Sequence, residues 1–107
     1  MQNRRAHYRI IYPATARPRF VYGSSISDVI ECSERGLRFR TAGVPPADGA
    51  RVSGRLSMRH GKEFRVSGKV VWGDEHVIAL FLDKTPIPFL AIMREQLHLR
   101  HLRRQFG

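Results

Sequence analysis

The stretch Arg51–Met58 (RVSGRLSM), the residues His60 and Gly61, and the stretch Phe64–Trp72 (FRVSGKVVW) decide the fold. In the first stretch apolar residues alternate with arginine and serine, which is typical of a strand with one buried face. The glycine after the histidine marks a tight turn between the two stretches. The sequence therefore predicts an antiparallel hairpin. Gly54 interrupts the apolar face, and we expect a β-bulge there.

The rest of the chain continues this pattern on both sides of the hairpin. Short runs of β-branched and aromatic residues are separated by Gly, Pro, Asp or Ser, which is typical of an all-β domain with tight connections. The further predicted strands are Ala14–Tyr22, Ser25–Cys32, Gly36–Arg40 and Val77–Phe81.

After Asp83 the pattern becomes helical. Thr85 and Pro86 resemble a helix start, and apolar residues then recur at helical spacing. We expect this apolar stripe to pack on the β-domain rather than to bind a cofactor. The residues of the stripe are Leu90, Met93 and Leu97.

Length and charge narrow the function. A chain of 107 residues has the size of one domain with one hydrophobic core. Nineteen basic residues against nine acidic residues give a formal charge of +10, which attracts anions. Sixteen of the basic residues are arginine, whose planar fork suits phosphates and the edge of guanine. The composition therefore favours a nucleotide or a nucleic acid as the partner.

The sequence contains no feature that predicts export or membrane insertion. The longest apolar runs fall far short of the roughly 20 residues that span a bilayer, and Met1 is followed by polar residues rather than by the apolar core of a signal peptide. The single cysteine, Cys32, agrees with a reducing compartment, and we expect it to point into the interior. We therefore expect a cytoplasmic protein with no membrane span.

No catalytic or metal-binding pattern stands out. Ser33 has no histidine near it in the sequence with which to form a nucleophile–base pair. Of the five histidines only His98 and His101 share a helical face, and no cysteine or carboxylate pattern accompanies them. We therefore expect a protein without enzymatic activity, metal or cofactor.

Two short motifs carry the functional prediction. Arg5 and Arg9 are separated by three residues, and Arg4 doubles the first arginine. Further along, the segment Glu31–Gly36 (ECSERG) places a carboxylate, the hydroxyl of Ser33 and a glycine between two predicted strands. These motifs resemble the RxxxR and (D/N)xSxxG motifs of PilZ domains. The match departs from the family pattern at position 31, where glutamate stands in place of aspartate or asparagine.

The resemblance covers the whole chain and implies a fold. It implies a six-stranded antiparallel β-barrel with a C-terminal α-helix. In this arrangement residues 1–12 are a flexible, arginine-rich ligand-binding segment, residues 13–83 approximately form the barrel, and residues 86–104 approximately form the helix. Ala79 stands in the closing strand where the family often has glycine.

The resemblance also implies a receptor for cyclic di-GMP that changes conformation on binding and signals through a protein partner. The ligand has two anionic phosphodiesters and two guanines. Guanidinium groups can grip a phosphate or the O6 and N7 acceptors of guanine, and a carboxylate can accept its N1 and N2 hydrogens. Serine can bond base or phosphate, and glycine allows a close backbone approach. The implied binding residues are Arg4, Arg5, Arg9, Glu31, Ser33 and Gly36.

Two other functions remain open. One is a small basic barrel that binds nucleic acid, which the same charge and strand aromatics such as Phe20, Phe39 and Trp72 would serve. The other is a PilZ-like adaptor that has lost the ligand and acts through protein contacts alone. Glu31 favours the adaptor, because its extra methylene displaces the carboxylate from the position that aspartate would give it.

Overall fold

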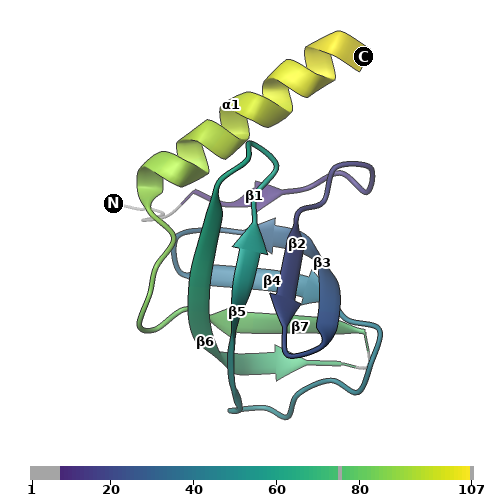
Figure 1. Cartoon of the computed structure of the whole chain (residues 1–107), viewed down its shortest axis with the longest axis vertical. Coiled ribbons are helices and arrows are strands. Elements are labelled where there is room, and N and C mark those ends of the chain that lie inside the picture. Colours follow the sequence, from purple (N-terminus) through teal and green to yellow (C-terminus); the bar gives the residue numbers. More distant parts are fainter. Residues whose placement is uncertain (1–7, 75, 107) are drawn as a thin grey trace, which may run out of the picture.

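The structure is a computed structural model, and it describes residues 8–74 and 76–106. Within these residues the chain forms seven β-strands followed by one long α-helix (Figure 1). The strands are β1 (Ile10–Ile11), β2 (Arg19–Tyr22), β3 (Ser25–Cys32), β4 (Gly36–Arg40), β5 (Arg51–Ser57), β6 (Glu63–Gly73) and β7 (Val77–Phe81), and the helix is α1 (Phe89–Phe106).

Six of the strands close into an antiparallel barrel. Neighbouring strands follow the order β3, β2, β5, β6, β7, β4, and β4 pairs back with β3 to close the ring. The extra strand β1 pairs with β3, with Ile10 opposite Cys32 and Ile11 opposite Glu31. Helix α1 lies across one end of the barrel (Figure 1). The predicted six-stranded barrel with a C-terminal helix is confirmed.

The first barrel strand is shorter than predicted. It begins at Arg19 rather than at Ala14, because the Ala16 amide donates to the Pro13 carbonyl at 3.0 Å and turns the chain there. β1 also lies inside the segment that the sequence predicts to be flexible. Its residue Ile10 is buried in the core, so at least this part of the segment is attached to the barrel.

β5 shows both a correct and an incorrect prediction. The residues expected to share its inner face are buried, namely Val52, Leu56 and Met58. The bulge expected at Gly54 is wrong, since the pairing of β5 with β6 runs through it without a shift. A Cβ at Gly54 would lie 2.3 Å from the carbonyl oxygen of Val21 and 2.9 Å from the Phe20 ring. Glycine is needed there because β2 approaches closely.

Helix α1 begins later than predicted and presents a different face. It begins at Phe89, directly after Pro88, whose carbonyl accepts the amides of Ala91 and Ile92. The apolar stripe predicted to pack on the barrel does not do so as a whole, since Leu90 and Leu97 are 61% and 58% exposed and only Met93 is partly buried. The buried face instead carries Ala91, Ile92 and Glu95, with Leu99 packed against the core.

The buried carboxylate of Glu95 sets this rotation of the helix. Its Oε2 accepts the Tyr12 hydroxyl at 2.7 Å and the Arg59 amide at 2.9 Å. Its Oε1 accepts the His60 amide at 2.9 Å and lies 2.7 Å from His60 Nδ1. The carboxylate therefore joins α1 to the segment after β1 and to the turn between β5 and β6. A buried acid with this many donors is satisfied rather than orphaned.

The charge state of this network follows from its contacts. Burial acts to raise the pKa of Glu95, but the hydrogen bonds from Tyr12, His60 and the two amides outweigh it and hold the pKa below its usual value. The carboxylate is therefore ionised at neutral pH, and His60 Nδ1 must donate to it. Burial raises the pKa of the neighbouring Cys32 thiol to about 12, so this cysteine packs as a neutral group, as its predicted inward orientation requires.

Among residues 8–74 and 76–106, no helix is both long enough and apolar enough to cross a bilayer.

Candidate functional site

Four of the six predicted site residues line one cleft on the barrel wall. Arg9, Glu31, Ser33 and Gly36 face a cavity of about 270 Å³. They come from two motifs that are about twenty residues apart in the sequence, and the pairing of β1 with β3 brings the motifs together. Arg4 and Arg5 lie outside the described residues.

The strand register builds the rest of the cleft. Glu31 on β3 is opposite Arg38 on β4, Arg38 is opposite Ala79 on β7, and Ala79 is opposite Trp72 on β6. Residues directly opposite each other in antiparallel strands share a face of the sheet. The row therefore runs across four strands on the outer face of the barrel. Because Ala79 is small, it leaves room between the Arg38 guanidinium and the Trp72 ring.

Two β-bulges turn the outer members of this row into the cleft. The pairing of β3 with β4 shifts between Val29 and Glu31, and the pairing of β6 with β7 shifts between Val70 and Trp72. Val29 and Val70 are buried, so strict alternation would also place residues 31 and 72 inside the barrel. The extra residue at each bulge reverses the alternation and points Glu31 and Trp72 outward. Bulges commonly re-aim side chains in this way beside functional sites.

The cleft is charged, and its charges are partly paired. Arg9 Nη1 lies 3.1 Å from Glu31 Oε2, and Arg38 Nη2 lies 2.8 Å from Glu31 Oε1. The Arg9 side chain is 54% exposed, while that of Glu31 is only 14% exposed. Nε of Arg38 is buried and has no hydrogen-bond partner among the described residues. One carboxylate thus holds two guanidinium groups at the mouth of the cleft, and one guanidinium donor there lacks an acceptor.

The turn between β3 and β4 supplies the serine and the glycine. The Ser33 amide donates to the Gly36 carbonyl at 2.9 Å, which closes the turn. A Cβ on Gly36 would lie only 3.1 Å from Ser33 Oγ. A side chain at position 36 would therefore press on the hydroxyl of the buried Ser33 at the cleft.

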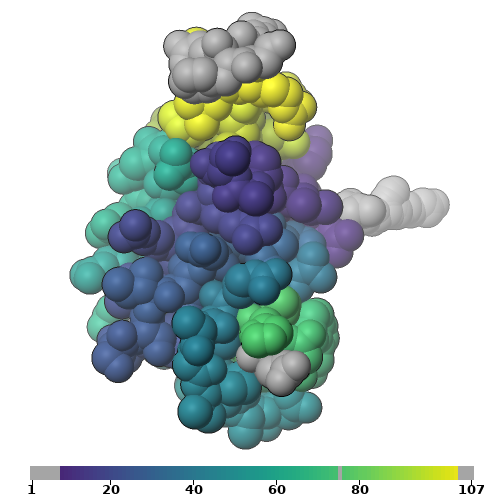
Figure 2. Space-filling view, turned by 90° about the vertical axis from the view of Figure 1, so that its right-hand side faces the viewer, coloured from purple at the N-terminus to yellow at the C-terminus, as the bar shows by residue number. Residues whose placement is uncertain are grey.

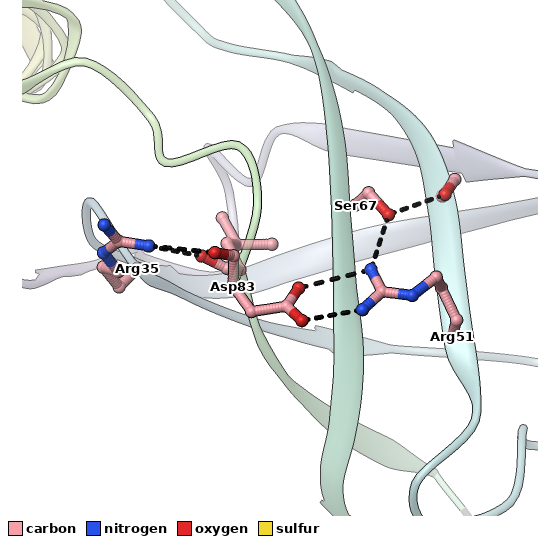
Figure 3. Close-up of polar contacts among 6 residues, drawn as sticks. Arg35, Arg51, Ser67 and Asp83 are labelled. Atoms are coloured by element: carbon pink, nitrogen blue, oxygen red, sulfur yellow. Dashed lines mark hydrogen bonds and ion pairs between the residues drawn. The ribbon is translucent and has the colours of Figure 1, made fainter.

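The same turn is attached to the linker that leads to α1. The Leu82 amide donates to the Arg35 carbonyl and the Ile87 amide to the Glu34 carbonyl, both at 2.8 Å. The Arg35 guanidinium returns two bonds to the linker, to the carbonyls of Leu82 and Asp83 at 3.2 and 3.3 Å (Figure 3). The turn between β3 and β4, which we call the motif turn, and the start of the helical region are therefore one hydrogen-bonded unit.

Asp83 extends this unit to the barrel wall. Its carboxylate receives two bonds from Arg51 on β5, at 2.7 and 3.2 Å, and Arg51 also donates to Ser67 on β6 (Figure 3). The Arg51 guanidinium holds the pKa of Asp83 below its usual value. This exposed pair fixes the linker in position on the barrel.

Sequence reasoning did not assign Arg38 and Trp72 to the site. Arg38 is one residue from the apolar positions of β4, and its relation to Glu31 becomes visible only with the register. Trp72 follows a run whose alternation would place it in the core, and only the bulge exposes it. The one signal for Trp72 in the sequence is its aromatic side chain at the end of a strand, and from the sequence alone this signal supports only nucleic-acid binding.

A comparison with protein families finds a match that covers most of the chain. The PilZ domain model matches residues 3–87, a range that includes both motifs and every strand. No curated protein and no solved structure matches the chain.

Proposed function

This chain belongs to the PilZ domain family, and from that premise we propose that it is a receptor for cyclic di-GMP that signals through a protein partner. PilZ domains are binding or adaptor domains rather than enzymes. The observation that best supports the proposal is the meeting of Arg9, Glu31, Ser33 and Gly36 in one cleft. The β1–β3 pairing places donors and acceptors of two separate motifs at one accessible cleft, where a single ligand could contact all of them.

The chemistry of the cleft suits the ligand's charged groups. Arg9 and Arg38 supply guanidinium forks for phosphodiesters or for guanine O6 and N7. The unpartnered Nε of Arg38 is buried, so an anionic oxygen would satisfy this donor once the side chain turns toward the ligand. Arg4 and Arg5, next to Arg9 in the sequence, would add further donors.

The walls of the cleft suit the guanine ring. Trp72 is 44% exposed and borders the cleft beside the small Ala79, so its indole face is available to a base. Stacking of a base on an aromatic ring contributes about 1–3 kcal/mol. Glu31 can accept the N1 and N2 hydrogens of the same base, which gives guanine an advantage over adenine.

Binding would require an exchange of partners at Glu31. In the described structure both of its oxygens accept arginine donors. We infer that Arg9 leaves Glu31 for the ligand, because its side chain is the more exposed of the two arginines and the strand that follows it is only two residues long. The freed oxygen would then accept from guanine. The ion pair thus keeps Arg9 near the cleft before the ligand arrives, which lowers the ordering cost of binding.

Two physical connections would carry this exchange to α1. One is the hydrogen-bonded unit of the motif turn and the linker at Leu82 and Ile87. The other runs along the chain from Arg9 to Tyr12, whose hydroxyl bonds Glu95 in the helix. A ligand that moves Arg9 or the motif turn therefore acts on residues that directly hold the helix.

The nucleic-acid alternative loses most of its aromatic platform, since of Phe20, Phe39 and Trp72 only Trp72 is exposed. Phe20 and Phe39 are fully buried and pack against each other at 5.1 Å between ring centroids, so neither can stack on a base. The adaptor alternative differs from the proposal only in the absence of ligand binding, so a titration with cyclic di-GMP distinguishes the two.

Calorimetric titration tests the proposed function. We expect the full chain to bind cyclic di-GMP at submillimolar concentrations and to bind GMP and GTP much more weakly. Trp72 fluorescence should change during the titration, because Trp72 is the chain's single tryptophan. Arg55→Ala is the matched control for Arg9→Ala, since it also removes one guanidinium charge but from an exposed position on β5 outside the cleft. No heat and no fluorescence change would support the adaptor function instead.

A further inference from the structure

A second hollow, larger than the ligand cleft, lies between α1 and the segment that follows β1. Its volume is about 560 Å³. Helix α1 contributes Leu99, Leu102 and Arg103, the segment after β1 forms the opposite wall, and Arg59 enters from the turn between β5 and β6. Figure 2 shows this side of the molecule, with α1 (yellow) above the segment that follows β1 (purple). We call this hollow the helix groove.

The helix groove combines an apolar surface with unpaired positive charge. Ile11, Pro13, Leu99 and Leu102 give it an apolar lining, and Ile11 is 67% exposed, a high value for a side chain of that size. Arg59 and Arg103 are exposed at the groove, and no ion pair to either is found among the described residues. The described residues that line the groove include no carboxylate.

This combination defines the chemistry of an occupant. An apolar side chain from the occupant would cover the isoleucine, proline and leucine surface, and carboxylates on either side of it would pair with the two arginines. Arginine beside apolar surface is also the composition that is enriched where protein interfaces contribute most energy. We propose that the helix groove binds a segment of a partner protein that carries an apolar side chain flanked by acidic residues.

The position of the helix groove connects it to the ligand cleft. Ile11 lines the groove and is the register partner of Glu31, which lines the cleft. Arg9, two residues earlier, contacts Glu31 directly. The short strand β1 therefore borders both sites, and a ligand that displaces Arg9 changes the strand that carries Ile11. This inference rests on the proposed function, which it extends by naming the chemistry of the partner.

The test uses the full-length chain and fluorescein-labelled peptides in three matched sets. One set carries leucine or phenylalanine flanked by glutamates, the second replaces the glutamates by lysines, and the third replaces the apolar residue by serine. Fluorescence anisotropy should show saturable binding of the first set alone. Amide chemical shifts in ¹H–¹⁵N spectra should move at Thr15, Ala16, Leu99 and Leu102, and binding should change in strength when cyclic di-GMP is added.

Two pairs of variants locate the binding. Arg103→Glu should weaken binding by at least about tenfold, whereas Arg100→Glu, on the same helix but outside the groove, should not. Leu102→Glu should also weaken binding by at least about tenfold, whereas its control, Leu97→Glu, should not. All four positions are at least partly exposed, so circular dichroism melts should remain close to those of the wild type.

Several outcomes would overturn the proposal. Preference for the lysine peptides, or equal binding of all sets, would refute the charge assignment. Dimerisation that Leu102→Glu abolishes would assign the groove to a second copy of the chain, and binding of anionic vesicles without peptide binding would assign it to a membrane surface. If the acidic peptides bind but cyclic di-GMP does not, the groove stands and the receptor function fails.

Discussion

Glu31 and Glu95 are both carboxylates that accept bonds with each oxygen, but their settings are opposite. Glu31 lies at an open cleft, and its partners are two arginine side chains, one of which is 54% exposed. Glu95 is fully buried, and two of its four partners are backbone amides. A long arginine side chain can exchange one acceptor for another, whereas a backbone amide is held in place by the fold. The comparison separates a carboxylate suited to exchange partners from one suited to fix a helix.

The same contrast distinguishes the two ends of β1. Arg9, before the strand, contacts Glu31 at the cleft, and Tyr12, after the strand, donates to the buried carboxylate of Glu95 in the helix. A binding event at one end therefore acts against a rigid attachment at the other. The following predictions test whether this division of roles holds.

The largest expected effect is that of Glu95→Ala on stability. It leaves the Tyr12 hydroxyl, His60 and two amides without their acceptor, and removal of one partner from a buried charged network costs about 3–5 kcal/mol. Glu31→Ala is the matched control, because its partners can reach water, and it should cost less than about 1 kcal/mol. Urea unfolding of both variants measures the difference. Equal losses would show that the two carboxylates do not differ as described.

The barrel was predictable from the sequence because its signals are local. Alternation in Arg51–Met58 and the turn at His60 and Gly61 depend on residues that are close in the chain. The rotation of α1 was not predictable in this way. Helical periodicity assigns apolar residues to the buried face and charged residues to the exposed face. Glu95 is buried because Tyr12 and the β5–β6 turn donate to its carboxylate, and these donors are known only from the fold.

The site shows the same division. The motifs predicted that Glu31, Ser33 and Gly36 lie together, and the structure places them at one cleft because their spacing is fixed within one turn. Trp72 and Arg38 were not assigned, because their places depend on strand register and on bulges that add one residue without a distinctive sequence. The glycine expected to mark a bulge, Gly54, marks instead a close approach of two strands.

The second prediction concerns the exchangeable side of the comparison. Arg9→Ala should weaken binding of cyclic di-GMP by at least about tenfold, since loss of a hydrogen bond to a charged group costs about 1.5–3 kcal/mol. Arg5→Ala should do the same if the sequence motif is functional. Calorimetry measures the affinities, and thermal melts should show almost unchanged stability. Wild-type affinity in both variants would show that these arginines are not part of the site.

The third prediction is a dependence of stability on pH that comes from Glu95. Because the folded protein holds the pKa of Glu95 below its usual value, the ionised carboxylate stabilises the fold above the unfolded pKa, near 4.5. This contribution is lost as the pH falls through the lower folded pKa. Glu95→Gln should therefore be less stable than wild type at neutral pH, by about 1–3 kcal/mol, and the difference should shrink in acid. Urea unfolding at several pH values measures it, and a constant difference would contradict the ionised network.

The smallest expected effect is that of Glu31→Asp on ligand affinity. The family motif carries aspartate or asparagine at this position, but in this chain the longer glutamate side chain reaches both Arg9 and Arg38, at 3.1 and 2.8 Å. Shortening it should loosen the hold on Arg9 while it brings the carboxylate to the family position, and these effects oppose each other. We expect a change of no more than about tenfold, or about 1.4 kcal/mol, by calorimetry. A gain in affinity of several orders of magnitude would mean that glutamate has degraded the site. The chain would then be better described as an adaptor in which Glu31 only forms ion pairs with two arginines.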